Sequence, residues 1–206
     1  MKLDARNTTA CFYAALLLPL YAAGVYVATG FLTGGRAELA SIYFSFESRI
    51  PLIPISILPY LSLDLLFIIA VFLPKSPQEL LRLVFRLVTV VAIAAICFLV
   101  FPLHFAFPRS APDGFFSLPY QALYRIDSTH NMLPSLHAAI TLIIWPTLAR
   151  HTPKPWRPAV HLWLTLTIFS TLFTHQHHIP DVLAALILAG LMFLLPFRHS
   201  TSELRT

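Results

Sequence analysis

Charged residues are scarce in this chain. Of its 206 residues, only 11% are Asp, Glu, Lys or Arg, and 57% are hydrophobic. Soluble globular domains carry roughly a quarter charged residues, and the mean hydropathy of +0.74 is high for a whole chain. This scarcity of charge excludes an ordinary soluble domain. It predicts an integral membrane protein with a single transmembrane domain over residues 1–206.

Cysteine is also rare. Cys11 and Cys97 both lie in apolar stretches, so they form neither a metal motif nor a disulfide framework. The net charge is +5, but the basic residues stand in short clusters between apolar runs. That distribution suits loops at a membrane surface better than a nucleic-acid interface.

Long apolar runs predict an all-α protein built as a bundle of six transmembrane helices. A spanning helix needs roughly 20 mostly apolar residues. The first run is too long for the core of a signal peptide and lacks a clear cleavage site, so we expect it to be a span. The expected spans cover about residues 11–32, 50–73, 84–101, 134–149, 159–174 and 180–197.

The basic residues also predict an orientation. If the N-terminus is cytoplasmic, ten of the 14 Lys and Arg residues fall on the inner side and four on the outer side. The positive-inside rule therefore favours cytoplasmic N- and C-termini. The loops 33–49 and 102–133 and the turn near 175–180 then share the outer face, which suits a bacterial inner membrane with the site facing the periplasm or exterior.

Two polar segments stand at the outer ends of predicted helices, at 124–137 and 174–181. Ionisable residues at membrane depth are costly and usually mark a site. Pro134 and Pro180 fit the first turn of a helix, where the backbone N–H groups have no internal partner. Such helix starts favour binding of an anion such as phosphate.

Three residues of these segments predict nucleophilic chemistry. His177 and Asp181 are four apart and share one helix face, so the carboxylate can orient one imidazole nitrogen and leave the other free. His137, from another helix, could protonate a leaving oxygen. Arg109 and Arg125, in the outer loop, could hold phosphate oxygens.

Other interpretations of the same residues stay open. The histidines between 175 and 178 could bind a metal together with His137 and Asp181, although no zincin spacing is present. They could equally form a solvated turn without a role. Arg125 could pair with Asp127 or lie among lipid headgroups.

The two segments resemble the type 2 phosphatidic acid phosphatase superfamily of membrane lipid phosphatases and phosphotransferases. Pro134-Ser135-Leu136-His137 is similar to its P-S-x-H motif, and the stretch from His177 to Asp181 is similar to its H-x-x-x-D motif. The resemblance covers about residues 100–190. The segment 101–109, with Asp127 and Asn131, is similar to a bacterial branch of the superfamily.

The resemblance implies a six-helix bundle and a reaction that needs no metal or cofactor. His177 would be the nucleophile that forms a phosphohistidine, Asp181 its partner, and His137 the acid for the departing alcohol. The residues expected to bind substrate are Arg109, Ser135, Arg125 and Asn131.

Two positively charged residues of the family pattern are missing from this chain. The motif K-x6-R-P aligns its arginine on Arg109, which puts Pro102 at the lysine position. The arginine that usually opens the third motif is replaced by Thr171. Arg125, His104 or His175 could substitute for the missing charges.

These observations lead to one main hypothesis and two alternatives. The main one is a lipid phosphatase that removes phosphate from a lipid phosphate or diphosphate at the outer face. The first alternative is a phosphotransferase of the sphingolipid- or phosphoinositol-synthase type, in which a lipid alcohol replaces water. The second is a non-enzymatic membrane transporter or binder.

Overall fold

The computed structural model describes residues 5–34 and 39–195, and side chains from residue 8 onward. These ranges fold into seven α-helices and three short 3-10 helices, and they contain no β-strand. The prediction of an all-α protein is confirmed. The α-helices are α1 (Ala5–Gly34), α2 (Ile57–Phe72), α3 (Pro77–Val100), α4 (Ser117–Ile126), α5 (Leu136–His151), α6 (Arg157–Phe173) and α7 (Ile179–Leu194). The 3-10 helices are η1 (Ser45–Arg49), η2 (Pro54–Ser56) and η3 (Lys154–Trp156).

Three helical segments in the described residues are long and apolar enough to cross a membrane: Thr8–Gly34, Pro54–Phe72 and Pro77–Val100. Helix α7 is apolar but shorter. Each of the six predicted spans overlaps one of the long helices α1, α2, α3, α5, α6 and α7. That all six cross a membrane stays a prediction, and residues 196–197 of the last predicted span lie outside the described residues.

The second predicted span, about 50–73, contains Pro51, Pro54 and Pro59, which predict a kink or a delayed helix start. Helix α2 begins only at Ile57, after the 3-10 turn of η2. Proline removes a backbone donor and restricts the residue before it to extended conformations, and Ile53, before Pro54, is indeed extended. The prolines therefore delay the helix, although the sequence around them is apolar.

The third predicted span, 84–101, begins too late. Helix α3 starts at Pro77, and the Ser76 side chain caps it by accepting a hydrogen bond from the Glu79 backbone N–H at 3.2 Å. Proline fits the first helical position because its missing N–H would be unsatisfied there anyway. The charged first turns of α3 lower its local hydropathy, so the apolar run alone does not reveal them.

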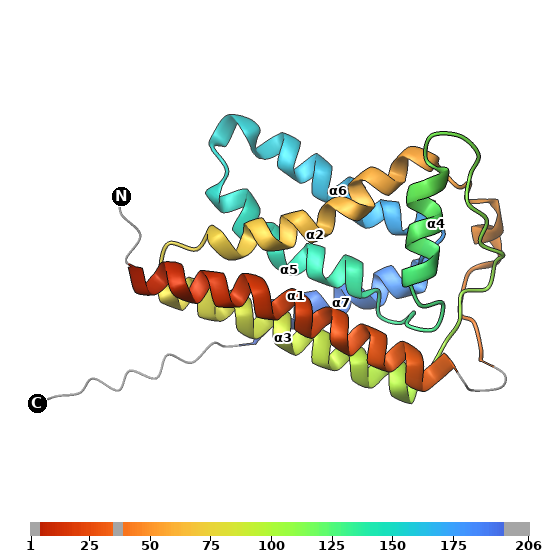
Figure 1. Ribbon diagram of the computed structural model, residues 1–206, viewed down its shortest axis with the longest axis horizontal. Helices are drawn as coiled ribbons and strands as arrows, with labels where there is room; N and C mark the ends of the chain where they lie inside the picture. The colour runs from red at the N-terminus through yellow and green to blue at the C-terminus, as the bar shows by residue number, and fades with distance from the viewer. Residues whose placement is uncertain (1–4, 35–38, 196–206) are drawn as a thin grey trace, which may run out of the picture.

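Helix α5 lies at the centre of the bundle. It packs against α2, α3, α6 and α7, while α1 packs against α2 and α3. The buried face of α5 includes Ala138, Ala139, Ile143 and Ile144, each at most 1% exposed. Small residues at such positions let helix backbones approach closely. The long helices run roughly along the long axis of the molecule, and α4 stands across one end (Figure 1).

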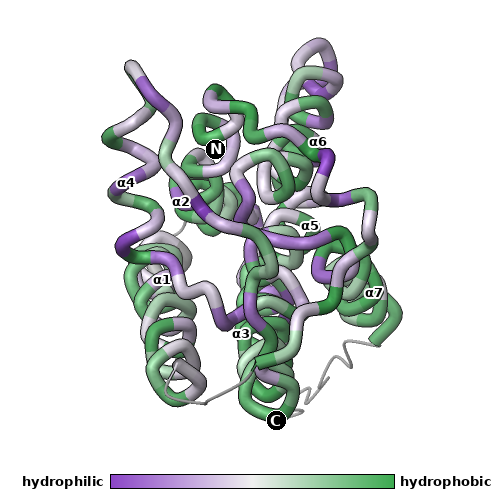
Figure 2. Tube along the Cα trace, turned by 90° about the vertical axis from the view of Figure 1, so that its right-hand side faces the viewer, coloured by the Kyte–Doolittle hydropathy of each residue, from purple (hydrophilic) through white to green (hydrophobic). Residues whose placement is uncertain are grey.

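The polar segments gather at the α4 end. Figure 2, which looks onto this end, shows hydrophilic stretches crossing it between largely hydrophobic helices. The sides of the long helices instead expose large apolar residues such as Leu20, Phe31, Leu65, Ile96 and Ile187. Contiguous apolar surface of this kind suits contact with lipid.

Helix α1 meets the loop before α5 at a close contact that requires glycine. A Cβ atom on Gly30 would lie 2.9 Å from Ser128 Oγ and 3.0 Å from Ser128 Cβ. Asn131 secures the same loop, since its Nδ2 donates to the Tyr26 carbonyl at 2.7 Å. A methyl group at position 30 would therefore push the loop away from α1.

We expect Gly30→Ala to lower the free energy of unfolding by about 1–3 kcal/mol, because overpacking displaces neighbours. Gly24→Ala is the matched control in the same helix, since nothing lies within 4 Å of its added Cβ, and it should leave stability unchanged or slightly raised. Thermal unfolding of both purified variants in one detergent checks this. Equal melting temperatures for the two variants would contradict the proposed close contact.

Candidate active site

The start of α7 brings His177 and Asp181 together. Asp181 Oδ2 lies 3.4 Å from His177 Nδ1 and accepts a hydrogen bond from the His178 backbone N–H at 2.8 Å. Asp181 is 1% exposed and His177 is 7% exposed. The carboxylate therefore fixes one ring nitrogen of His177, and the other nitrogen remains for chemistry.

The starts of α5 and α7 are directly bonded to each other. The Ser135 backbone N–H donates to the Asp181 carbonyl oxygen at 3.0 Å. The Ser135 side chain caps α5 by accepting from the Ala138 N–H at 3.2 Å. Ser135 is fully buried. Its backbone bond joins the start of α5 to the start of α7, and its side chain caps α5, so its observed role is structural.

His137 lies in the first turn of α5. Its ring stacks on Tyr60 of α2, with centroids 4.0 Å apart and planes 11° apart. Its Nε2 atom is buried and has no hydrogen-bond partner in the described part of the chain. A buried nitrogen without a partner costs free energy, which a ligand in the adjacent space would recover.

That adjacent space is a cavity of about 490 Å³ between α1, α2, α4 and α5. Most of the residues around it are apolar, among them Ala22, Leu63, Phe67 and Ile140. Its polar lining residues are Tyr26, Tyr60, Asp64, Asp127, His137 and His177. The cavity can hold an apolar chain beside two histidines.

Arg109 is held close to the start of α7. Its Nε donates to the His175 carbonyl at 3.0 Å, and its Nη2 donates to the Gln176 carbonyl at 3.2 Å. These two carbonyls immediately precede His177 in the chain. The side chain is 8% exposed and lies over the Phe105 ring at 5.0 Å. Its Nη1 is buried without a hydrogen bond among the described residues, and the Asp127 carboxylate lies 3.7 Å from it.

Asp127 connects this arginine to α1. Its Oδ2 lies 3.7 Å from Arg109 Nη1, and its Oδ1 accepts a hydrogen bond from Tyr26. Burial raises the pKa of Asp127, while the Arg109 charge and the Tyr26 hydrogen bond act in the opposite direction. The alternative that Arg125 pairs with Asp127 is therefore wrong, since the partners of Asp127 are Arg109 and Tyr26.

Sequence reasoning missed Glu47, which is 4% exposed. Its Oε1 accepts from the Phe44 N–H at 2.8 Å. Its Oε2 accepts from the Ile179 N–H at 3.1 Å and lies 3.0 Å from His178 Nδ1. Glu47 thus anchors the turn that leads into α7. The available signal was one acidic residue in a loop between two apolar runs, in a chain with only 9 Asp and Glu residues.

The His178 ring belongs to this anchor. Its Nε2 accepts a hydrogen bond from the Ala106 backbone N–H at 3.1 Å, so its Nδ1 carries the proton that faces Glu47. Phe105 stacks on the ring at 4.5 Å, and Phe107 meets it edge-on at 5.1 Å. Burial lowers the pKa of His178, and the Glu47 contact opposes this shift. Both ring nitrogens are occupied, which gives His178 a structural role.

The histidines of the turn at 175–178 contact different partners. This argues against the alternative that they bind a metal ion together. His175 Nε2 lies 3.1 Å from the Ile50 carbonyl, His178 faces Glu47, and His177 faces Asp181. Among the described residues, no three His, Cys, Asp or Glu side chains are grouped so that they could hold a metal ion. His175 also adopts a positive φ of 55°, a conformation that is costly for a residue with a side chain.

Other predicted site residues lie away from the cavity. Arg125 is exposed near the end of α4. Asn131 is buried, but it bonds to α1 rather than lining the cavity. His104 contacts Ser41 in the loops at the α4 end. None of these three bonds the carbonyls before His177 as Arg109 does, and Arg109 itself also lies outside the cavity lining.

The fold and site together define a class: an all-helical protein with membrane-length apolar helices and a buried histidine–carboxylate pair beside an apolar cavity. A family model described as the PAP2 superfamily matches residues 45–195. The chain belongs to this superfamily, which confirms the resemblance to the type 2 phosphatidic acid phosphatases. Comparison with curated proteins gives no match. Membership supports an enzyme of the phosphatase or phosphotransferase kind.

The Glu47 anchor generates a prediction. Glu47→Gln removes a charge that three donors share, and the amide also brings a buried N–H₂ group without an acceptor. We expect a loss of about 1–3 kcal/mol in the free energy of unfolding. Asp113→Asn is the matched control, because it makes the same chemical change at an exposed position of an outer loop. Thermal unfolding measures both, and equal effects would contradict the anchoring role.

Proposed function

We propose that the chain is an integral membrane lipid phosphatase that acts through a phosphohistidine. The observation that carries the proposal is the apolar cavity with His137 and His177 in its wall. A lipid phosphate would place its hydrocarbon in the cavity and its phosphate against the start of α7. The phosphate would then meet His177, Arg109 and the positive end of a helix dipole.

In the first step, Nε2 of His177 attacks phosphorus while the bond from phosphorus to the lipid oxygen breaks. Asp181, on the opposite ring nitrogen, orients the imidazole and stabilises its positive charge. His137, in its protonated form, gives a proton to the departing lipid alkoxide. In the second step, water attacks phosphorus as the P–Nε2 bond to His177 breaks, and the proton of the water passes to His137. Phosphate leaves, and the His177 imidazole and protonated His137 are regenerated.

Arg109 would stabilise the charge on the phosphoryl oxygens. Phosphoryl transfer depends mainly on positioning and on such charge stabilisation. The Arg109 side chain is fixed by two backbone carbonyls and keeps Nη1 without a hydrogen bond in the described residues. It therefore enters the reaction already oriented.

The same arrangement supports a second candidate, a phosphotransferase in which a lipid alcohol replaces water. The specific observation is the small number of cations: among the described residues, Arg109 is the one guanidinium bonded to the turn before His177. A phosphodiester carries one negative charge, whereas a phosphomonoester carries nearly two at neutral pH. A single guanidinium is better matched to the diester that a headgroup transferase uses.

The proposed topology has six spans, with the site at the outer face of a bacterial inner membrane. Arg82, Arg86 and Arg150 cluster at the end of the bundle away from His177, which agrees with an inner location of that end. The cytoplasmic placement of both termini remains a proposal, since residues 1–4 and 196–206 lie outside the described residues.

The decisive experiment measures phosphate release from a panel of lipid phosphates by the detergent-purified protein with excess chelator. We expect release to survive the chelator and to fall at least about 10³-fold in His177→Ala, because the nucleophile is lost. His161→Ala is the control, since that histidine lies on α6 outside the cavity lining.

The other outcomes separate the alternatives. Headgroup transfer to an added lipid alcohol without phosphate release would replace the phosphatase by the transferase. Release abolished by the chelator would restore the metal interpretation of the histidines. Neither release nor transfer from any lipid would favour the non-enzymatic binder.

Arg109 generates a second prediction. Arg109→Lys keeps the charge but loses the planar group that bonds the His175 and Gln176 carbonyls while facing the phosphate. We expect kcat/KM to fall about 100-fold, the typical effect of removing one oriented donor. Arg125→Lys makes the same change at an exposed site and should stay within about threefold. A comparable loss in Arg125→Lys would instead assign substrate binding to that residue.

A further inference from the structure

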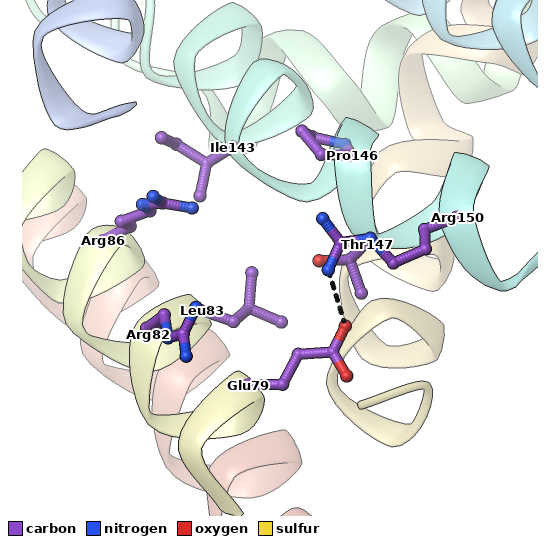
Figure 3. A pocket seen from close by; sticks show the side chains of 8 residues that line it. All are labelled: Glu79, Arg82, Leu83, Arg86, Ile143, Pro146, Thr147 and Arg150. Atoms are coloured by element: carbon purple, nitrogen blue, oxygen red, sulfur yellow. Dashed lines mark ion pairs between the residues drawn. The ribbon is translucent and has the colours of Figure 1, made fainter. Parts of the chain in front are cut away.

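A second cavity lies at the other end of the bundle, between α3 and α5. It has a volume of about 150 Å³. Arg82 and Arg86 reach it from the first turns of α3, and Arg150 reaches it from the last turn of α5, with Glu79 beside them (Figure 3). Leu83 and Ile143 form an apolar wall. The cavity shares no lining residue with the cavity at His177.

The positive charge around this cavity exceeds the negative charge. Glu79 is the one carboxylate in its lining, against three arginines. Its Oε1 lies 2.8 Å from His151 Nε2 and 3.6 Å from Arg150 Nη1, and its Oε2 accepts from the Lys75 N–H at 3.0 Å. Glu79 is thus largely committed to its own neighbours, and the excess positive charge calls for an anion.

The three arginines differ in exposure. Arg82 and Arg150 are exposed, whereas Arg86 is half-buried and packs over the Phe193 ring of α7 at 4.4 Å. Arg82 and Arg86 are four apart on one helix, so they share a face. The packing on Phe193 keeps the Arg86 guanidinium beside the cavity, where an anion would meet it.

We propose that this cavity binds a phosphate-bearing anion, separate from the substrate at His177. Guanidinium groups bind phosphate oxygens through paired hydrogen bonds, and the cavity has room for a compact tetrahedral anion. Basic pockets between membrane helices suit anionic headgroups. The ligand is therefore the phosphate of an anionic lipid in the leaflet opposite the active site, or a free phosphate with the same chemistry.

The distance between the sites makes them separable. His137 and Arg150 stand 13 residues apart on α5, and a rise of 1.5 Å per residue puts them about 20 Å apart along the helix. Variants of one site therefore leave the side-chain contacts of the other in place. Failure of the proposed catalytic function would leave this binding proposal standing.

The test uses the purified full chain in detergent and measures thermal unfolding during three titrations. The probes are inorganic phosphate, phosphatidylglycerol and, as a zwitterionic comparison, phosphatidylcholine. A ligand that binds the folded state raises the melting temperature, and the stabilisation grows with the logarithm of the ligand concentration divided by Kd. We expect phosphate or phosphatidylglycerol to stabilise the protein, and Arg86→Gln and Arg150→Gln each to weaken the apparent affinity about tenfold or more.

Lys154→Gln is the matched control, because it removes one positive charge from the same end of the bundle outside the cavity. It should change the affinity less than about twofold. Arg150 is exposed, so Arg150→Gln keeps the test valid if Arg86→Gln fails to fold. His177→Ala should bind both probes like the native chain.

Each outcome decides the proposal. Arginine-dependent binding of phosphatidylglycerol alone supports a lipid headgroup, and arginine-dependent binding of inorganic phosphate supports a free anion. Equal losses in Lys154→Gln and the arginine variants would reduce the effect to general surface charge and overturn the proposal. Loss of binding in His177→Ala would assign the anion to the other cavity, and no stabilisation by either anion would also overturn it.

Discussion

The first turn of α7 is anchored by Glu47 and Asp181, two carboxylates almost completely shielded from solvent. A buried carboxylate is tolerated only when donors surround it. Here the donors are the otherwise unpaired N–H groups of His178 and Ile179 and two imidazoles. The helix start thus supplies donors to Glu47 and to Oδ2 of Asp181, whereas Oδ1 of Asp181 is buried without a hydrogen-bond partner among the described residues. The contact with Oδ2 holds His177 at the start of α7.

The remaining contacts of the site extend from this anchor. Asp181 also receives the Ser135 N–H through its carbonyl, which fixes α5 and therefore His137 relative to α7. The carbonyls before His177 orient Arg109, and Asp127 connects Arg109 to Tyr26 on α1. Polar contacts consequently connect the wall of the apolar cavity to the turn that holds His177. A lipid bound there would meet a site that is already ordered.

Local sequence rules predicted the parts of this arrangement that depend on local geometry. The spacing of His177 and Asp181 predicted their contact. The prediction that Pro134 lies in the first turn of a helix was close but wrong, because Ser135 caps α5 and the helix begins at Leu136. Glu47 with His178, and Tyr26 with Asp127, join residues more than 100 positions apart, so no local pattern reveals them. The start of α3 was missed for a different reason, because its charged first turns face a polar cavity and reduce the apolar signal.

Arginine side chains have different surroundings at the two ends of the bundle. This difference affects which ligand each end would bind. At the α7 start, Arg109 is buried, oriented by two backbone carbonyls and paired with Asp127. Its guanidinium is therefore fixed in direction, so recognition there would depend on geometry as well as on charge. At the other end, three arginines and one carboxylate line the proposed anion cavity, so recognition there would rest on net charge more than on geometry. Specificity is therefore expected at the histidines, whereas binding at the arginine cavity should respond strongly to salt.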